Sequence, residues 1–441
     1  MAKDKMVYMA VASDFFHDGL RNVIEEAVKY GAVIIGLLTD EAIASYKRLP
    51  LTDYQTRERL FASIKGVEMV VPQKTLSYGD NLRQYRPDFV IHGDDWKSGI
   101  QSGVRNQVIT VLKEWGGSLI EIPYSDTEKI RALEKQYEKQ FQTPENRRAA
   151  LRRLLKMRPY IRGIEVSNGL SGLIAEQTRF EDERQLCVRE FDALWISSLC
   201  DSSWKGKPDI ELVDINSRLN TVNEIMEVTA KPIIFDGDTG GKAEHFVYHV
   251  RTLERLGVSA IMIEDKKGLK QNSLLEGAVH HELEDKAVFA AKIKAGKEAQ
   301  VTTEFMIFAR LESLIAGAGT ADALERADAY LQAGADGIMI HSKDPDGADL
   351  FAFLRLFRQR YQEVPVVLVP TAYHRFTEEQ LHAAGASLII YANQLLRSAY
   401  PAMVKTARMI LADGCSRQAG DSLCMPIHDI VHLISGGESK T

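Results

Sequence analysis

Short apolar runs rich in β-branched residues alternate with stretches of helical periodicity along the whole chain. In the first 124 residues these runs are separated by helical segments at 20–30, from 40 onward and at 104–115. Continuous apolar strands with helices between them are typical of a parallel sheet covered on both faces. We therefore predict a small doubly wound, Rossmann-like domain with strands at Met6–Val11, Ala32–Leu38, 67–71, 88–92 and 118–122.

A second and longer β/α series begins at Ile161. It contains enough β/α units to predict a (β/α)8 TIM-type barrel, a fold whose chemistry takes place where the strands end. The candidate strands are 163–166, 172–175, 193–197, 232–236, 260–264, 305–309, 337–341, 366–369 and 387–391.

A highly charged segment, residues 125–158, separates the two series. Its periodicity predicts a helical connector, and we interpret its charges as a solvated helix face. We place a first domain at 1–130, the connector at 131–145 and the barrel domain at 146–441.

Composition narrows the class of protein. A length of 441 residues exceeds what one core usually supports, which favours two domains. The net charge of -6 argues against a nucleic-acid partner, because such proteins need a basic face. The four cysteines show no CxxC spacing, and no apolar run approaches the roughly 20 residues that span a bilayer. We expect a cytoplasmic protein with reduced thiols and no membrane contact.

The segment from Glu264 to Ser273 is the most informative part of the sequence. A buried strand ends in the pair Glu264-Asp265, and a basic, polar loop follows. A carboxylate at a strand end beside such a loop suits an anionic ligand in a barrel. The alternative is an ordinary solvated βα connection.

Polar residues also end the other predicted barrel strands. Acidic groups at neighbouring strand ends, with no cysteine or histidine beside them, favour a hard cation such as Mg2+. Each residue has a simpler explanation, since Asp236 or Asp238 could cap a helix and Arg310 could pair with Glu312. Packing alone rarely explains so many buried polar groups together. The set comprises 195–199, 236–241, 264–265, Arg310, His341, 370–371 and Asn393.

Taken together, these motifs resemble the phosphoenolpyruvate mutase family of the isocitrate lyase/phosphoenolpyruvate mutase superfamily. The resemblance covers about residues 146–435 and implies a (β/α)8 barrel that exchanges its last helix with a neighbouring subunit, in a homodimer or homotetramer. It rests on Trp195–Leu199, Asp209, the Asp236-Gly-Asp238-Thr-Gly turn, Glu264-Asp-Lys with Lys270-Gln-Asn272-Ser273, Ala309-Arg310, His341-Ser-Lys and Tyr391-Ala-Asn393. The loop has no cysteine, unlike that of the lyases in the superfamily.

The resemblance implies roles for these residues. Asp236 would ligate Mg2+, Asp238 and Glu264 would hold its water shell, and Asp209 would lie nearby. The catalytic group would further include Lys270, Asn272, Arg310 and His341. The substrate would be bound by Trp195, Ser197, Ser198, Leu199 and Ser273, although Ser198 replaces a frequent glycine of the family.

The implied reaction moves phosphorus between the enol oxygen and C3 of pyruvate, interconverting phosphoenolpyruvate and 3-phosphonopyruvate. Such a transfer needs positioning and charge stabilisation more than a nucleophile. Water must be excluded, so residues 266–273 are expected to form a lid. The alternatives are a C–C lyase, a phosphonopyruvate hydrolase, an oxaloacetate-type decarboxylase and a non-catalytic scaffold. Lack of a loop cysteine disfavours the lyase, and Asn272 disfavours the hydrolase.

Residues 1–124 resemble cytidylyltransferase-type nucleotidyltransferases, which implies CTP as a ligand. His17 begins the family's His-x-Gly-His motif, but Leu20 stands where the second histidine belongs. The family's late Ile-Ser-x-Thr motif is reduced to a remnant at 123–128. Arg57 and Asp94 are further candidate nucleotide-binding residues. We favour a degenerate domain over an active cytidylyltransferase that acts on a phosphonate.

Overall fold

The structure is a computed structural model. It describes residues 5–434 except 15, 47–48, 98–99, 124–127, 129–131, 134–135, 137–138, 183–186, 269, 271 and 274–280.

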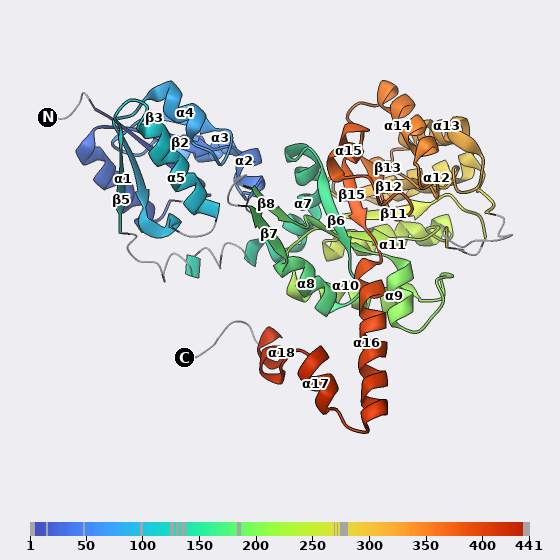
Figure 1. Cartoon of the computed structure of the whole chain (residues 1–441). Helices are drawn as coiled ribbons and strands as arrows, with labels where there is room; N and C mark the ends of the chain where they lie inside the picture. The colour runs from blue at the N-terminus through green and yellow to red at the C-terminus, as the bar shows by residue number, and fades with distance from the viewer. Residues whose placement is uncertain are drawn as a thin grey trace. The chain divides into compact units, whose positions relative to one another are not determined.

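The N-terminal part forms a parallel five-stranded sheet in the order β3-β2-β1-β4-β5 (Figure 1). Successive residues of β1 face opposite layers, since Val7 packs with α1 and Tyr8 packs with α5. This arrangement confirms the predicted doubly wound, Rossmann-like fold. The elements are β1 (Met6–Val11), α1 (Asp18–Tyr30), β2 (Ala32–Leu38), α2 (Asp40–Ala44), α3 (Tyr54–Ala62), β3 (Val67–Gln73), α4 (Gly79–Tyr85), β4 (Phe89–Gly93), η1 (Asp94–Trp96), α5 (Ile100–Leu112) and β5 (Ser118–Ile122).

The second part is a closed barrel of parallel strands in the order β10-β11-β12-β13-β14-β15-β6-β9, which confirms the predicted TIM-type fold. A short antiparallel hairpin, β7–β8, precedes β9. The strands are β6 (Ile161–Glu165), β7 (Arg179–Asp182), β8 (Cys187–Glu190), β9 (Ala193–Ile196), β10 (Ile233–Asp236), β11 (Ala260–Glu264), β12 (Met306–Leu311), β13 (Gly337–Ile340), β14 (Val366–Leu368) and β15 (Leu388–Tyr391). The helices are α8 (Gly169–Gln177), α9 (Ser198–Trp204), α10 (Ile215–Val228), α11 (Ala243–Leu256), α12 (Lys286–Ala299), α13 (Gly319–Gln332), α14 (Ala348–Arg360) and α15 (Glu378–Ala383).

One predicted strand is wrong. Residues 172–175 lie inside helix α8. Asn168 caps this helix, because its side chain accepts from the Ser171 backbone amide at 2.8 Å while the Ser171 hydroxyl is close to the Asn168 amide. A short apolar run does not by itself distinguish a strand from a buried helix segment.

The interpretation of the connector's charges as a solvated helix face is also wrong for its C-terminal part. After the turn η2 (Gln140–Gln142), helix α7 (Pro144–Met157) packs against the barrel. Arg147 is only 3% exposed and donates to the Thr229 carbonyl at 2.9 Å. Arg152 pairs with Asp336 at 2.7 Å. These arginines pair with acceptors of the barrel. The run of charged residues in the sequence therefore did not indicate which of its side chains are exposed.

Residues 392–441 form a separate compact unit, described up to residue 434. It contains α16 (Gln394–Asp413), α17 (Arg417–Leu423) and α18 (Ile427–Ile434), and Asn393 with a φ of 66° precedes α16. Apolar side chains of α18 are largely exposed, with Ile427 at 77% and Val431 at 61%. No helix in the described ranges is long and apolar enough to cross a membrane.

Candidate active site

Three neighbouring barrel strands bring their polar ends together. Asp236 ends β10, Glu264 ends β11 and Arg310 lies near the end of β12. Glu264 and Arg310 are direct register partners. All three residues are buried. Because the strands are parallel, their carboxyl ends meet at one mouth of the barrel, where this fold carries its active site.

The turn after β10 has an unusual backbone. Asp238 adopts a φ of 52°, which costs a residue with a side chain about 1–3 kcal/mol and is common at functional sites. The Asp238 amide donates to Oδ1 of Asp236 at 3.1 Å. A Cβ at Gly237 would lie 2.8 Å from the side chain of Ile261 and 2.9 Å from that of Ile263, so any larger residue would crowd these buried side chains. The turn therefore holds two carboxylates close together at the strand end.

Lys270 from the loop is surrounded by acidic groups. Its Nζ lies 3.5 Å from Oδ1 of Asp209 and 3.7 Å from Oδ2 of Asp236, and it also contacts Asp238 and the Ser198 hydroxyl. Burial alone would lower the pKa of Lys270, but these carboxylates outweigh it and raise the pKa. The buried ammonium group is therefore charged and balances the acidic cluster.

Asp236, within this acidic cluster, is kept ionised. Burial raises the pKa of the Asp236 carboxyl, but Lys270, Arg310 and Arg218 outweigh this, so the pKa lies below its usual value. Arg218 donates to Oδ2 of Asp238 at 2.9 Å and stacks over the Phe235 ring. An ionised carboxylate at this strand end is suited to hold a cation.

The donor set fits a hard divalent ion held mainly through water. Neither carboxylate oxygen of buried Glu264 nor Oδ1 of Asp209 accepts a hydrogen bond from the described residues. They take part instead in ion pairs, Glu264 with Arg310 at 3.0 Å and Asp209 with Lys270 at 3.5 Å. Burial raises the pKa of Glu264 to about 7, an effect that Arg310 and Lys270 only partly offset. Among the described side chains, no three carboxylate, thiol or imidazole groups converge on one point as direct ligands. The roles predicted for Asp236, Asp238 and Glu264 around Mg2+ stay a prediction.

A second, mixed cluster lies at the ends of β12 and β13. Arg310 pairs with Glu264 at 3.0 Å and donates from Nε to Glu312 at 2.5 Å. His341, directly after β13, places Nδ1 2.9 Å from Oε1 of Glu312. Burial lowers the pKa of His341 and Arg310 adds to this, while Glu312 opposes it. The imidazole is therefore neutral near pH 7 unless a further anion lies beside it.

The two residues of the acidic pair face different surroundings. Glu264 joins the cluster at the barrel mouth, whereas Asp265 accepts from Tyr330 at 2.8 Å and from Arg326 at 3.2 Å. Asp265 also accepts from the Glu312 amide at 2.9 Å. Alternation along a strand turns neighbouring side chains to opposite faces. Glu264 is thus the candidate functional residue, and Asp265 stabilises the barrel wall.

The described loop residues contact both clusters. Lys270 enters the acidic cluster, and Asn272 donates to Oδ2 of Asp209 at 3.1 Å. Ser273 donates to Oε2 of Glu312 at 2.8 Å and accepts from Arg310 at 3.0 Å. These contacts form two groups that adjoin along the loop. Lys270 and Asn272 contact Asp209 in the first group, and Ser273 contacts Arg310 and Glu312, the partner of His341, in the second.

The segment after β9 supplies hydrogen-bond donors next to the acidic cluster. Ser198 donates from its amide and its hydroxyl to Oδ2 of Asp236, at 3.2 and 3.1 Å. Ser197 caps α9 by accepting from the Cys200 amide at 3.2 Å. Trp195 is buried, and its indole N–H has no partner among the described residues. Leu199 is half-buried in the first turn of α9.

The sequence did not lead us to predict a site role for two acidic residues near these groups. Glu312 was considered only as a partner of Arg310, yet it joins two strand ends to the loop. Glu165 ends β6, is 4% exposed and hydrogen bonds the buried Cys200 thiol. Its position at a strand end was a sufficient signal to find it.

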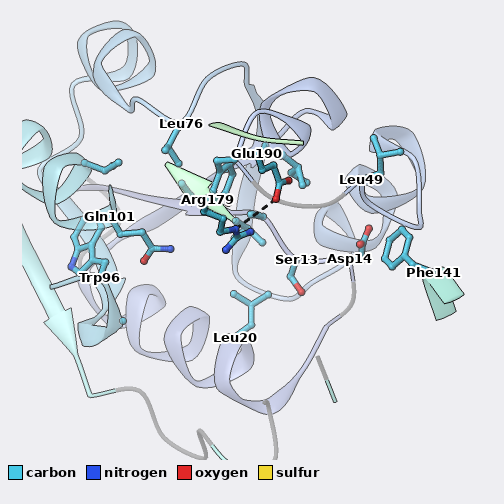
Figure 2. Close-up of a pocket in the computed structure, with 18 of the residues that line it drawn as sticks. Ser13, Asp14, Leu20, Leu49, Leu76, Trp96, Gln101, Phe141, Arg179 and Glu190 are labelled. Atoms are coloured by element: carbon cyan, nitrogen blue, oxygen red, sulfur yellow. Dashed lines mark ion pairs between the residues drawn. The ribbon is translucent and has the colours of Figure 1, made fainter. Parts of the chain in front are cut away.

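The N-terminal domain has a pocket at the carboxyl ends of its strands (Figure 2). Ser13, Asp14, Leu20 and Trp96 lie around it. The basic residues that line it, Arg158, Arg179 and Lys231, are all paired, Arg158 with Asp192 and the other two with Glu190. The described lining residues between 9 and 104 are mainly apolar and include no lysine or arginine, and the three basic residues elsewhere in the lining already have carboxylate partners.

The predicted nucleotide-binding residues are not gathered at one point of this pocket. His17 caps α1, its Nδ1 accepting from the Leu20 amide at 3.2 Å, and Leu20 packs into the domain core. Arg57 is buried and pairs with Asp40 at 2.5 Å, and Asp94 lies 4.0 Å from Lys97 at the surface. The predicted late motif at 123–128 lies largely outside the described residues.

Comparison with known proteins identifies the barrel. Residues 151–411 match the family described as phosphoenolpyruvate phosphomutase. The chain belongs to this family. Residues 13–161 match the cytidylyltransferase-like family.

Relatives of the phosphomutase family carry more than one name. The phosphoenolpyruvate phosphomutase of Tetrahymena pyriformis is 36% identical over 251 residues, which cover 57% of this chain and 79% of that protein. A crystal structure of the Streptomyces platensis subsp. rosaceus phosphomutase is 34% identical, with a TM-score of 0.58, and covers 65% of this chain and 94% of its own. A phosphonopyruvate hydrolase in complex with oxalate and Mg++ is 31% identical, with a TM-score of 0.57 and the same coverage. Family membership therefore does not distinguish a mutase from a hydrolase, and this distinction depends on the residues of the site.

Proposed function

We propose that the protein is a phosphoenolpyruvate mutase, which interconverts phosphoenolpyruvate and 3-phosphonopyruvate and so forms the P–C bond of phosphonates. The observation that carries this proposal is the position of Arg310. It pairs on one side with Glu264, whose strand lies beside that of Asp236, and on the other side with Glu312, which also contacts His341. One end of the site is thus suited to a cation with an enolate, and the other end is suited to a phosphoryl group.

Asp236, Asp238 and Glu264 would hold Mg2+, which supplies positive charge beside the pyruvate enolate. The hydrolase relative with bound Mg++ and oxalate supports this assignment, because oxalate has the shape and charge of that enolate. Oε1 of Glu264 and Oδ1 of Asp209 accept no hydrogen bond from the described residues, so they are available to water molecules around such an ion. Hard oxygen donors without thiols are the ligands that Mg2+ prefers.

The chain's own groups then position the reacting atoms. Trp195, Ser197, Ser198 and Leu199 form the end of the site that binds the pyruvate carboxylate. Arg310, His341, Asn272 and Ser273 hold the phosphoryl group as its bond to the enol oxygen breaks and its bond to C3 forms. A loose transition state of this kind needs fixed positive charge and precise alignment, and no covalent intermediate is required.

Water exclusion separates mutase from hydrolase chemistry. Lys270, Asn272 and Ser273 contact both ends of the site, which supports a loop that closes over the phosphoryl group. The segment 264–285 contains no cysteine, which disfavours the lyases of the superfamily. The test is 31P NMR of purified protein with phosphonopyruvate and Mg2+. A mutase produces phosphoenolpyruvate, whereas a hydrolase produces phosphate.

For the N-terminal domain we infer a structural or regulatory role. Leu20 belongs to the core, and the buried Arg57 is balanced by Asp40 at 2.5 Å and Asp14 at 4.0 Å. The domain would then not bind a triphosphate tightly. Incubation with CTP, Mg2+ and 2-aminoethylphosphonate tests this inference, and release of pyrophosphate would overturn it.

We also infer a homo-oligomer, a dimer or a tetramer. Exposure of the apolar side chains of α18, including Ile427 and Val431, to water is unfavourable. Burial of this face between subunits would account for them. Light scattering at micromolar concentration tests the inference, and a monomer would overturn it.

A further inference from the structure

Glu312 lies at the centre of the phosphoryl end of the site. It follows β12 directly and is fully buried. Oε1 accepts from Nε of Arg310 at 2.5 Å and lies 2.9 Å from Nδ1 of His341. Oε2 accepts from the Ser273 hydroxyl at 2.8 Å and lies 3.3 Å from Nζ of Lys266. One carboxylate therefore joins the ends of two strands to two residues of the loop.

The position of Glu312 is itself fixed from behind. Its backbone amide donates to Oδ1 of Asp265 at 2.9 Å. The other oxygen of Asp265 is held by Tyr330 and Arg326 on α13. The carboxylate is thus anchored through both main chain and side chain, which leaves it little freedom to follow a partner that moves.

A buried carboxylate is costly unless its partners repay the loss of hydration. Here the partners are Arg310, His341, Lys266 and Ser273, so the group is fully compensated. Compensation alone would need only one strong pair. Each oxygen of Glu312 is shared between two partners, and these partners come from different elements. This indicates that Glu312 fixes the orientation of these groups and does not only balance their charge.

We propose that Glu312 is a positioning residue, which orients Arg310 and His341 toward the phosphoryl group and couples their orientation to loop closure through Ser273. This inference rests on the proposed function. By accepting the hydrogen of Nδ1, Glu312 fixes the tautomer of His341 and leaves Nε2 as the ring nitrogen that can face the substrate. Glu312 itself touches no reacting atom.

The substitution Glu312→Gln tests this role with little change in volume. A glutamine has one acceptor oxygen, and its NH2 group would face either Arg310 and His341 or Ser273 and Lys266, which act as donors. One side of the network must therefore come apart. We expect kcat for consumption of phosphonopyruvate to fall about 100-fold, because misplacement by about 1 Å can cost that much. We expect KM to change much less than kcat.

Two further variants and a spectroscopic measurement complete the design. Glu312→Asp keeps both acceptor oxygens and should recover part of the lost kcat. Glu254→Gln is the matched control, because Glu254 is a buried carboxylate outside the site that accepts from Thr302 at 2.7 Å. It should lower thermal stability and leave kcat unchanged.

In 15N-histidine NMR without substrate, the His341 ring signals, assigned with His341→Gln, should shift in Glu312→Gln and not in Glu254→Gln.

The outcomes separate this inference from the proposed function. Unchanged kcat and unchanged His341 signals in Glu312→Gln would overturn the positioning role, whatever the product. Equal loss of kcat in Glu312→Gln and Glu312→Asp, without a shift of the His341 signals, would also overturn it. A wild-type product of phosphate would instead overturn the mutase assignment, because consumption of phosphonopyruvate can be measured in either case.

Discussion

Glu264 and Arg310 are register neighbours on β11 and β12, and their side chains form a buried ion pair of 3.0 Å at the barrel mouth. This pair is where the acidic cluster meets the phosphoryl end of the site. A mutase needs these two environments within one small cavity, since the same phosphorus atom is bonded in turn to an oxygen and to a carbon of one substrate.

Asp236→Asn should remove the main charge of the acidic cluster. Because Lys270 and Arg218 then lack part of their counter-charge, we expect binding of Mg2+ with oxalate to weaken by at least about 100-fold. Titration calorimetry measures this directly, and circular dichroism checks that the barrel is intact. Wild-type affinity in a folded Asp236→Asn protein would contradict the metal assignment.

Asn272→Ala should separate the loop from Asp209, whose Oδ2 accepts from the Asn272 side chain at 3.1 Å. We expect the rate of isomerisation to fall by about 100-fold or more, because the phosphoryl group loses a donor and the loop loses an anchor. The comparison variant is Asn216→Ala, on the surface helix α10. Full activity of Asn272→Ala in a 31P NMR time course would exclude this role.

Leu20→Ala should destabilise the N-terminal domain by about 2–4 kcal/mol, because Leu20 is a core residue and truncation leaves a cavity. Val28→Ala on the same helix, with Val28 42% exposed, should cost much less. Urea unfolding followed by tryptophan fluorescence measures both. Equal, small effects would mean that Leu20 does not support the core.

Glu121 provides a pH test of the N-terminal domain. Its hydrogen bonds with Arg105, and then with Trp96, lower its pKa to about 2. A lowered pKa in the folded state adds stability above the unfolded-state pKa, and this stability is lost as the pH falls toward 2. The free-energy difference between wild type and Glu121→Gln should therefore be largest near pH 7 and shrink between pH 5 and pH 3. A pH-independent difference would contradict the assigned partners.

Much of this architecture could be predicted from the sequence, since the hydrophobic pattern alone indicates both the doubly wound domain and the barrel. The strand ends at Asp236, Glu264, Arg310 and His341 were also visible, because the carboxyl ends of parallel strands meet at one mouth. Residues 172–175 were misassigned because a short apolar run fits both a strand and a buried helix.

The pairing within the site could not be predicted in the same way. Glu264 and Asp265 are adjacent acidic residues that the sequence does not distinguish. Only the direction in which each side chain points places Glu264 in the site and Asp265 against α13. The role of Glu312 depends on Ser273 and His341, which are distant in the sequence and come together only through the closed barrel. The charge run at Arg147 gave no sign of burial, because its acceptors are backbone carbonyls of a distant segment.

The most direct test of the account is the product formed from phosphonopyruvate by the full-length protein with Mg2+, followed by 31P NMR. The mutase site predicts a phosphoenolpyruvate signal that grows as phosphonopyruvate disappears, and phosphonopyruvate that re-forms in small amount from added phosphoenolpyruvate. Release of inorganic phosphate as the main product, or no reaction with either compound, would contradict it.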